Sequence, residues 1–435
     1  MNKIYNMNAI VQKTGITANT LRAWERRYQL PMPTRSKGGQ RQYSEEDVNT
    51  VKWLLARKNE GMGIRLAVDL WNEIKTEGGN PLEEMSLASA KLALSSDRDT
   101  KMHSPEDYRQ SWLNACLEFD GAKADRVIAE AFGIYDTQVV CLEILQDALV
   151  EIGTLWYEGK ATVQQEHFAS GLAVRKINAL ISANTDPTRE ERVVIATPPN
   201  EEHVISSLIL TLFLRQSGYR VVNLGANVPI EGLKIMLSII DPTLVVLSAT
   251  HLGSLRGLLE TANYLAEQET PVAYGGRIFN EYAELQGKIP GEYLGYDLMD
   301  SRQRIEEMLQ SEPEKPRKWI VSSELQNSWK VYAQNRQNIE NQASEAFEGA
   351  DKVLEFQHRF VADNVEANLT LGLDDPLQGE LHWANDYSEK NELNIPLLSD
   401  YLKQYLEASK SELGDSGLPV QNWLLGALKI LEKAE

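Results

Sequence analysis

Cysteine and histidine are scarce in this chain, which has two cysteines and six histidines in 435 residues. Cys116 and Cys141 lie far apart in the sequence and form no CxxC pair. Two isolated cysteines are typical of small, buried, apolar side chains in a reducing compartment. We therefore expect a cytoplasmic protein without a disulfide framework.

Long apolar segments are also missing. No run of eighteen apolar residues occurs, so we expect no membrane span. The first residues, "MNKIYNMNAI", have neither the apolar stretch nor the cleavage site of a signal peptide. The apolar content of 42% and charged content of 25% are those of a globular protein, and the length predicts several domains.

Positive charge is confined to one end of the chain. Residues 1–75 contain thirteen Lys and Arg against seven Asp and Glu, a balance of +6 within a total of −19. The remaining 360 residues therefore carry −25. A basic head on an acidic body predicts that the head binds a polyanion and that the body does not.

Periodicity and breaks in the sequence predict a multidomain α and α/β protein. We expect, in order, a winged helix-turn-helix head, a linker, a four-helix bundle, a Rossmann-like (flavodoxin-like) domain and a mostly helical tail. Their predicted ranges are 1–75, 76–103, 104–185, 190–310 and 319–435. Short β-rich runs alternate with helical stretches only in the fourth of these, which predicts a parallel sheet covered by helices. Those runs are "RVVIATPP", "YRVVNLGA", "TLVVLSAT", "PVAYGG" and "EYLGYD".

The head has the pattern of a DNA reader. A helix "MNAIVQKT", a turn at Gly15 and a second helix "ANTLRAWERRY" capped by Thr17 form a helix-turn-helix. A basic hairpin with Gly38-Gly39 at its tip follows, and Ser44-x-x-Asp47 begins a third helix. A solvent-exposed basic helix with no partner is the alternative, and the order of the three features argues against it.

This head resembles the MerR-family winged helix-turn-helix, through "TLRAWERRYQLPMPTRS", "GGQRQYS", "EEDV" and "GMGIRLAVDL". The resemblance implies that it binds a double-stranded DNA operator. Helix arginines would lie along the major groove and the wing arginine would contact phosphate. The residues expected to contact DNA are Thr20, Arg22, Arg26, Arg27, Arg35, Arg41 and Tyr43.

The stretch "LWYEGKATVQQEHFAS" places an indole near a carboxylate and an imidazole. Gly159 breaks the chain after Trp156, and Thr162 with Gln165 has the spacing of a capping box that begins a new helix. Trp156 then ends one helix while Glu166 and His167 begin the next. All three side chains could face one cavity, or they could be an ordinary core residue and two solvated ones.

A second imidazole follows the first predicted strand. Glu201 and His203 fall in its carboxyl-end loop, where an imidazole can bind a metal and the carboxylate can hold its other nitrogen. Small residues end two other strands and leave room for a long group between them. These are Ser248, Thr250, Gly275 and Gly276.

Together the helical and β blocks resemble the cobalamin-binding module, a four-helix cap before a Rossmann-like domain. The lower-ligand signature of that module, acid-x-His-x-x-Gly, reads Glu201-x-His203-x-x-Ser206 here, with Glu for Asp and Ser for Gly. Trp156, nine residues and Glu166-His167 match the upper signature of the CarH/LitR subfamily. The MerR head, cap and cobalamin domain also occur in that subfamily's order.

This resemblance implies a light-responsive, adenosylcobalamin-dependent transcriptional repressor and not an enzyme. His203 would be the lower axial ligand of cobalt, and Trp156, Glu166 and His167 would surround the adenosyl group. The homo-oligomer, a dimer or tetramer, would bind DNA in the dark and come apart after photolysis of the cobalt–carbon bond.

One residue departs from the pattern of the resembled photoreceptors, which carry a His after the Trp. Tyr157 stands there, so a light state with two imidazole ligands requires another His, and His251 is either that ligand or an ordinary loop residue. A regulator that senses cobalamin level or a second chromophore remains the main alternative. A cobalamin enzyme and a regulator with a non-functional cofactor site are the others.

The tail, 319–435, extends beyond the usual length of the resembled subfamily. "SSELQNSWKVYAQNRQNIENQASEAF" predicts one polar helix, and the stretch around "GDSGLP" predicts two more. We expect a helical bundle for oligomer contacts or, alternatively, a noncovalent site for a bilin or other tetrapyrrole. Four aromatic residues are expected to add aromatic surface: Trp383, Tyr401, Tyr405 and Trp423.

Overall fold

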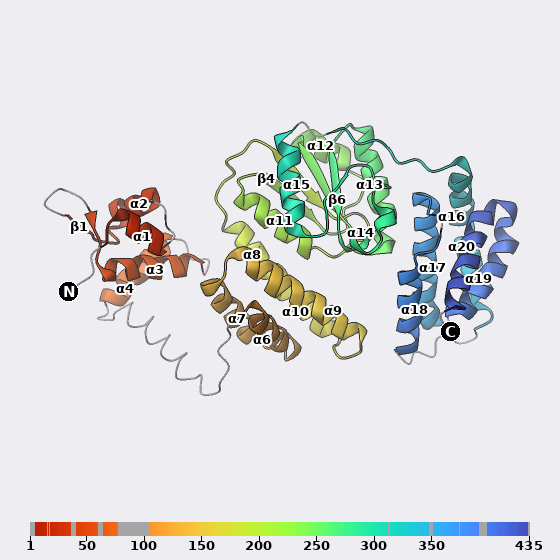
Figure 1. Cartoon of the computed structure of the whole chain (residues 1–435), viewed down its shortest axis with the longest axis horizontal. Coiled ribbons are helices and arrows are strands. Elements are labelled where there is room, and N and C mark those ends of the chain that lie inside the picture. Colours follow the sequence, from red (N-terminus) through yellow and green to blue (C-terminus); the bar gives the residue numbers. More distant parts are fainter. Residues whose placement is uncertain are drawn as a thin grey trace. The chain divides into compact units, whose positions relative to one another are not determined.

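The fold is described from a computed structural model (Figure 1), which divides the chain into two compact units, Met1–Met102 and His103–Glu435. The described residues are 5–14, 16, 18–35, 41–59, 64–76, 104–311, 314–347, 351–373, 375–390 and 398–433. The predicted linker 76–103 lies outside them except for Thr76.

The first unit is a winged helix-turn-helix, as predicted. Its elements are α1 (Met7–Thr14), α2 (Ala18–Tyr28), β1 (Thr34–Arg35), β2 (Arg41–Gln42), α3 (Glu45–Asn59) and α4 (Ile64–Thr76). The two strands pair antiparallel as the wing, whose tip at 36–40 is outside the described residues, as are Gly15 and Thr17. Ser44 and Asp47 exchange cap hydrogen bonds at the start of α3, and Trp53 meets Trp71 edge-on in the core.

The second unit begins with the cap, a four-helix bundle as predicted. The cap helices are α6 (Pro105–Leu117), α7 (Gly121–Ile134), α8 (Thr137–Val139) continued by π-helix η1 (Val140–Gln146) and α9 (Asp147–Tyr157), and α10 (Val163–Ser182). Capping boxes start α6 at Ser104 and α10 at Thr162. Both cysteines are free and buried in this bundle.

A parallel five-stranded sheet follows, in the order β4-β3-β5-β6-β7. Its strands are β3 (Arg192–Ala196), β4 (Arg220–Gly225), β5 (Leu244–Ser248), β6 (Val272–Gly275) and β7 (Glu292–Tyr293). The connecting helices are α11 (Ile205–Gln216), α12 (Leu233–Ile240), η2 (Leu252–Ser254), α13 (Leu255–Glu267), α14 (Arg277–Glu281), η3 (Ala283–Leu285) and α15 (Leu298–Gln310). This is the flavodoxin-like order, which confirms the predicted Rossmann-like class.

Alternate side chains of β3 pack into two different hydrophobic cores, one on each face of the sheet. Val193 and Ile195 pack against α11 and α15, whereas Val194 and Ala196 face the core that contains α13. Period-two alternation in a sheet covered on both faces explains why the strands are apolar throughout.

The tail is helical, as predicted, and it contains helices beyond the three predicted from its sequence. Its helices are α16 (Ser323–Ser344), α17 (Asp351–Leu371), α18 (Gln378–Lys390), α19 (Leu398–Leu413), η4 (Gly414–Gly417) and α20 (Leu418–Leu431). The expected aromatic surface is wrong for three of the four residues, since Tyr401, Tyr405 and Trp423 belong to the buried core of this bundle. Among the described residues, no helix has the length and apolarity needed to cross a bilayer.

Candidate functional site

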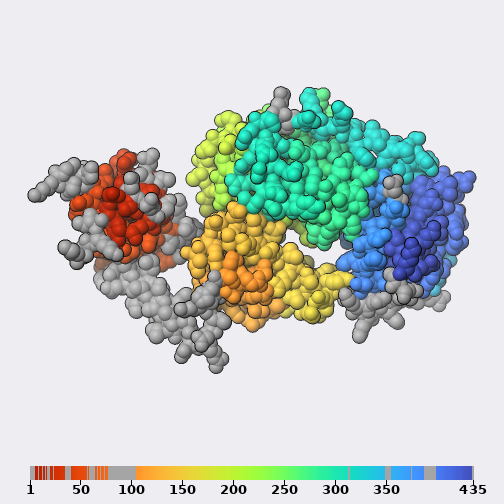
Figure 2. All heavy atoms as spheres, viewed as in Figure 1, coloured from red at the N-terminus to blue at the C-terminus, as the bar shows by residue number. Residues whose placement is uncertain are grey.

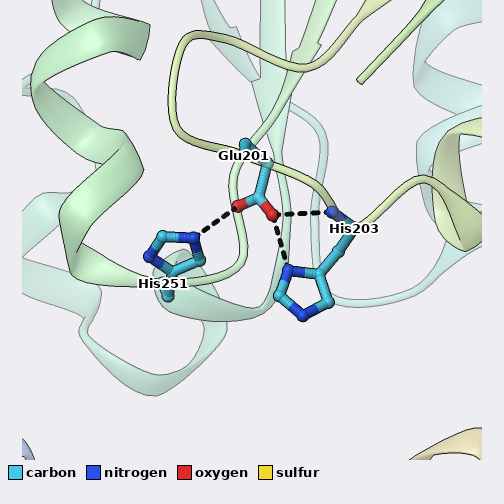
Figure 3. Close-up of side chains that lie close together, drawn as sticks. All are labelled: Glu201, His203 and His251. Atoms are coloured by element: carbon cyan, nitrogen blue, oxygen red, sulfur yellow. Dashed lines mark hydrogen bonds and ion pairs between the residues drawn. The ribbon is translucent and has the colours of Figure 1, made fainter. Parts of the chain in front are cut away.

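Glu201 and His203 form the centre of the site, in the loop that follows β3 (Figure 3). His203 Nδ1 lies 2.6 Å from Glu201 Oε1, and the His203 backbone amide donates to the same oxygen at 3.0 Å. Because the carboxylate accepts at Nδ1, the proton is held there and Nε2 is left as the basic nitrogen. The sequence prediction that these two residues act as a pair is consistent with this geometry.

Glu201 is fully buried, and two donors from the segment that follows β5 hold it. The Thr250 amide donates to Oε2 at 2.6 Å, and the Ser254 hydroxyl donates to the same oxygen at 3.0 Å. Burial alone would raise the pKa of Glu201, but the hydrogen bond from His203, the nearby His251 and the Thr250 amide outweigh it and lower the pKa to about 2. The carboxylate is therefore ionised at neutral pH.

The His203 ring points outward from the buried Glu201 carboxylate, and its side chain is 68% exposed. The hydrogen bond to Glu201 raises the pKa of His203 despite partial burial, and the Glu166 carboxylate of the cap raises it further. Glu166 is thus near enough to act electrostatically on His203.

His251 shares the same carboxylate. Its Nε2 lies 3.8 Å from Glu201 Oε2, and its ring lies edge-on to that of His203 with 5.8 Å between the centroids. Burial lowers the pKa of His251. The ligand atoms of Glu201, His203 and His251 all lie within 4.8 Å of one another, so the three residues are close enough to share one metal ion. A role for His251 as a cobalt ligand in a light state stays a prediction.

The predicted upper residues lie at the junction of α9 and α10. Trp156 is in the last turn of α9 and is 39% exposed, while Glu166 and His167 are in the first turn of α10. His167 Nδ1 lies 2.6 Å from Glu166 Oε2, and Ser170 donates to the other carboxylate oxygen. Because the His167 side chain is 74% exposed, both a polar face and an indole are open to a ligand here.

The small residues at the strand ends have distinct roles. Ser248 and Gly275 are paired across β5 and β6. A Cβ on Gly276, at a φ of +118°, would lie 1.9 Å from the Ala249 carbonyl oxygen, so glycine is required by this close approach. Thr250 contributes hydrogen bonds as well as space, because its hydroxyl lies 2.9 Å from His203 Nδ1 and 3.0 Å from Glu201 Oε2.

A narrow apolar cavity lies beneath the loop, between the sheet and helices α12 and α13. Its lining includes Val194, Ala196, Leu224, Val245, Leu247 and Leu265. Thr261 also lines it, and within the described part of the chain its buried hydroxyl has no hydrogen-bond partner. The lining is apolar apart from this hydroxyl, and the free volume of about 10 Å³ is close to that needed for one water molecule. The slot would therefore have to widen to admit a heteroaromatic group such as the nucleotide tail of a cobalamin.

The basic residues of the head are only partly available to DNA. Arg22, Arg26 and Arg27 are exposed on α2, as a groove-facing role requires. Thr20 is half-buried, and the side chain of Arg35 is outside the described residues.

The wing residues are engaged with α2. Arg41 Nε donates to Glu25 at 2.7 Å and keeps 33% of its side chain exposed. Tyr43 is fully buried, and its hydroxyl donates to Glu25 at 2.6 Å. The expectation that Tyr43 contacts DNA is corrected, because its hydroxyl attaches the wing to α2 instead.

Several residues of the site were not predicted from the sequence. Ser254 reaches Glu201 from 53 residues away, and Thr261 lines the cavity from α13. His251 was considered as a metal ligand, but its position beside Glu201 was not predicted. A short hydroxyl-bearing segment directly after a strand is too common to be a signal by itself. Only the assembled sheet shows that these side chains meet.

Two protein-family models match parts of the chain, one in the head and one in the cap. Residues 5–73 match the model described as MerR HTH family regulatory protein. Residues 108–181, which span most of the cap, match the model described as B12 binding domain.

Curated relatives combine the same parts. The chain is 30% identical over 277 residues to the HTH-type transcriptional repressor CarH of Myxococcus xanthus, which covers 63% of this chain and 89% of that protein. It is also 30% identical over 245 residues to the repressor CarA of the same organism, covering 56% and 75%. Among solved structures, the monomethylamine corrinoid protein of Methanosarcina barkeri matches 47% of this chain and all of that chain, with a TM-score of 0.41 and 14% identity.

Proposed function

The chain belongs to the CarH-type MerR transcriptional regulators, and on that premise we propose that it is a light-responsive, adenosylcobalamin-dependent repressor. The observation that carries the proposal is the Glu201–His203 pair at the carboxyl end of β3. It offers an outward imidazole whose other nitrogen is held by a buried, ionised carboxylate. This is what a metal-ligating histidine needs for a fixed tautomer and raised basicity.

The residues of the two halves have separate roles in this proposal. His203 would hold cobalt through its outward nitrogen, and the apolar slot that Thr261 lines would take the nucleotide tail once it widens. Trp156 packs against the adenosyl group, while Glu166 and His167 offer it polar contacts. Ser248, Thr250, Gly275 and Gly276 border the corrin side of the sheet.

Adenosylcobalamin supplies a cobalt–carbon bond that visible light can break. In the dark, Trp156, Glu166 and His167 bind the upper group, and this fixes the ends of α9 and α10. After illumination these side chains lose that ligand, so we expect the cap to shift and the homo-oligomer to dissociate. The switch is a population shift whose size is limited by the difference in cofactor affinity between the two states.

DNA affinity follows from the number of heads held together. Arg22, Arg26 and Arg27 present positive charge on α2, and Arg41 adds a positive charge on the wing. One head makes a salt-sensitive contact of modest affinity, and tethering several raises the effective concentration of each for the operator. Dissociation of the oligomer therefore releases the DNA.

One observation favours a second candidate, a regulator that senses cobalamin level without useful photochemistry. Tyr157 occupies the position after Trp156, and its ring stacks on Trp383 of the tail. Its hydroxyl is not a nitrogen ligand. No observation tests the bilin or other tetrapyrrole site expected in the tail, so it stays a prediction.

Absorption spectra and gel filtration distinguish these candidates. We expect purified protein to bind adenosylcobalamin, to change its spectrum under green light and to elute later once illuminated. Binding without a light-dependent change in size would favour the cobalamin-level sensor. A failure to bind cobalamins would contradict both candidates.

A further inference from the structure

The tail is attached to the sheet domain by a shared hydrophobic core. Ala367, Leu371 and Leu377 are at most 3% exposed and belong to the same buried cluster as β3, β5, β6 and α13. Lys288 of the sheet domain donates to the Leu371 and Gly372 carbonyls at 3.3 and 2.9 Å. The attachment therefore cannot open without exposing core residues.

Helix α17 also contacts the segment that supports the lower histidine. The Asp363 carboxylate packs on Gly253, where an added Cβ would lie 2.5 Å from Asp363 Oδ2. Gly253 precedes Ser254, whose hydroxyl donates to Glu201. Nearby, Arg256 lies 3.4 Å from Glu366 and 4.3 Å from the ring of Trp329. The tail is thus linked to His203 through Ser254 and Glu201.

On the other side, the tail contacts the cap at the turn that carries Trp156. The rings of Tyr157 and Trp383 are stacked, with 6.2 Å between centroids and 19° between planes. The Tyr157 hydroxyl donates to the Trp383 carbonyl at 3.5 Å. Figure 2 shows an opening bordered by the yellow end of the cap, the green sheet domain and the blue tail. One small domain therefore spans both sides of the proposed cofactor site.

We propose that the tail is a bracket for the cofactor site, in which Trp383 holds Tyr157 and so positions Trp156 over the cofactor. The inference rests on the proposed function. Its two attachments are unequal, because the sheet side is a buried core whereas Trp383 remains 40% exposed. The cap contact can open and close while the sheet contact persists. Tyr157 and Trp383 are positioning residues that need not touch the cofactor.

Thermodynamic linkage makes this bracket measurable. If the stack favours the cap position in which Trp156 meets the upper group, then removing the stack should weaken cofactor binding by up to the same factor. A stacked aromatic pair contributes enough to change an equilibrium about 2- to 10-fold. The effect depends on both rings together, so it should disappear once either ring is gone.

A double-mutant cycle on the full chain tests this. The dissociation constant of adenosylcobalamin is measured in the dark for wild type, Tyr157→Ala, Trp383→Ala and the double variant. We expect about 2- to 10-fold weaker binding in each single variant and no additional weakening in the double. Tyr157→Phe keeps the stack and loses only the long 3.5 Å hydrogen bond, so it should bind more tightly than Tyr157→Ala. Leu425→Ala, at a tail residue of similar exposure at 42%, should bind like wild type. Unchanged binding or fully additive effects would overturn the bracket.

Cross-linking tests the contact directly. Tyr157→Cys combined with Trp383→Cys should react with a short bismaleimide, because the two positions are adjacent. Burial raises the pKa of Cys116 and Cys141 to about 12, so the native thiols do not compete. We expect an intramolecular product only in the double variant, and slower cobalamin release once it forms.

The outcomes separate this inference from the proposed function. If wild type binds cobalamin but the cycle and the cross-link show no coupling, only the bracket is wrong. If wild type binds no cobalamin, both proposals are wrong.

Discussion

Replacing Glu201 with Gln removes the charge that holds His203 while keeping the shape of the side chain. All of the atoms that bond to this carboxylate are donors or imidazole nitrogens: the backbone amides of His203 and Thr250, the hydroxyls of Thr250 and Ser254, and His203 Nδ1. The NH₂ group of a Gln side chain would face some of these donors, so neither group would have a hydrogen-bond acceptor. Glu201→Gln should therefore destabilise the protein and release the ring of His203.

The size of the effect follows from the pKa of Glu201. Folding lowers it from 4.5 to about 2, and each pKa unit corresponds to about 1.36 kcal/mol. Ionised Glu201 thus contributes about 3 kcal/mol to the stability of the folded state. Because the folded pKa is the lower one, the contribution is present above pH 4.5 and is lost as the pH falls towards 2. At pH 7 the variant should show the whole deficit.

Two assays measure the consequences. Thermal unfolding at pH 7, followed by circular dichroism, should show a midpoint lower by several degrees. Titration with adenosylcobalamin should show affinity weakened by about 10- to 100-fold, the usual effect of removing the partner of a metal-binding histidine.

Glu202→Gln is the matched control. Glu202 is the adjacent residue, is exposed and accepts one hydrogen bond, from Asn227 Nδ2 at 3.0 Å. It should change stability by less than about 0.5 kcal/mol and leave cobalamin binding intact. If Glu201→Gln behaves like this control in both assays, the assignment of Glu201 as the support of His203 is refuted.

Other parts of the chain give three further predictions. Arg26→Ala should weaken operator binding and reduce the slope of log affinity against log salt by about 1 for each phosphate that Arg26 neutralises. Lys52→Ala on α3 should change neither the affinity nor the slope. Equal effects of the two substitutions would contradict the role of α2. Asp363→Asn should stabilise the protein at pH 7.5 by up to about 3 kcal/mol in urea unfolding, because burial raises the pKa of Asp363 to about 6. Its ionised form opposes folding as the pH rises through that value, so the gain should shrink towards pH 4, and a less stable variant at pH 7.5 would refute this sign. Gly276→Ala should lower the free energy of unfolding by about 3 kcal/mol or more in the same assay, because of the +118° φ of Gly276 and the close Ala249 carbonyl oxygen. Gly275→Ala is the control and should change stability little, since its added Cβ would lie 3.7 Å from Leu294 Cβ, an ordinary contact distance.

Features that depend on neighbouring residues could be predicted from the sequence. The capping box predicted from Thr162 and Gln165 needs a partner only three residues away, and it is present. The Glu201–His203 pair is separated by one residue, so its geometry is set by a single loop. Strand–helix alternation likewise predicted the flavodoxin-like sheet, because each unit carries its own periodicity.

Features that depend on the assembled fold could not. Tyr43 lies in the basic wing and so looks like a DNA contact in the sequence. In the fold its hydroxyl donates to Glu25, eighteen residues earlier, and its ring is buried in the core. Helix α17 buries the polar residues Gln357, Asn364 and Asn368, which interrupt the apolar stripe that would mark a helix in the sequence. The contact between Tyr157 and Trp383 joins residues 226 positions apart, so no local pattern indicates it.

The central claim is that a nitrogen of His203 binds cobalt, and electron paramagnetic resonance of the cob(II)alamin-loaded protein tests it most directly. In protein grown with ¹⁵N-histidine, coordination by His203 predicts that each cobalt line is split into a doublet by the ligand nitrogen, and that this doublet is absent in His203→Ala. A triplet in the labelled wild-type protein would show that the cofactor's own ¹⁴N base remains bound to cobalt, and would contradict the account.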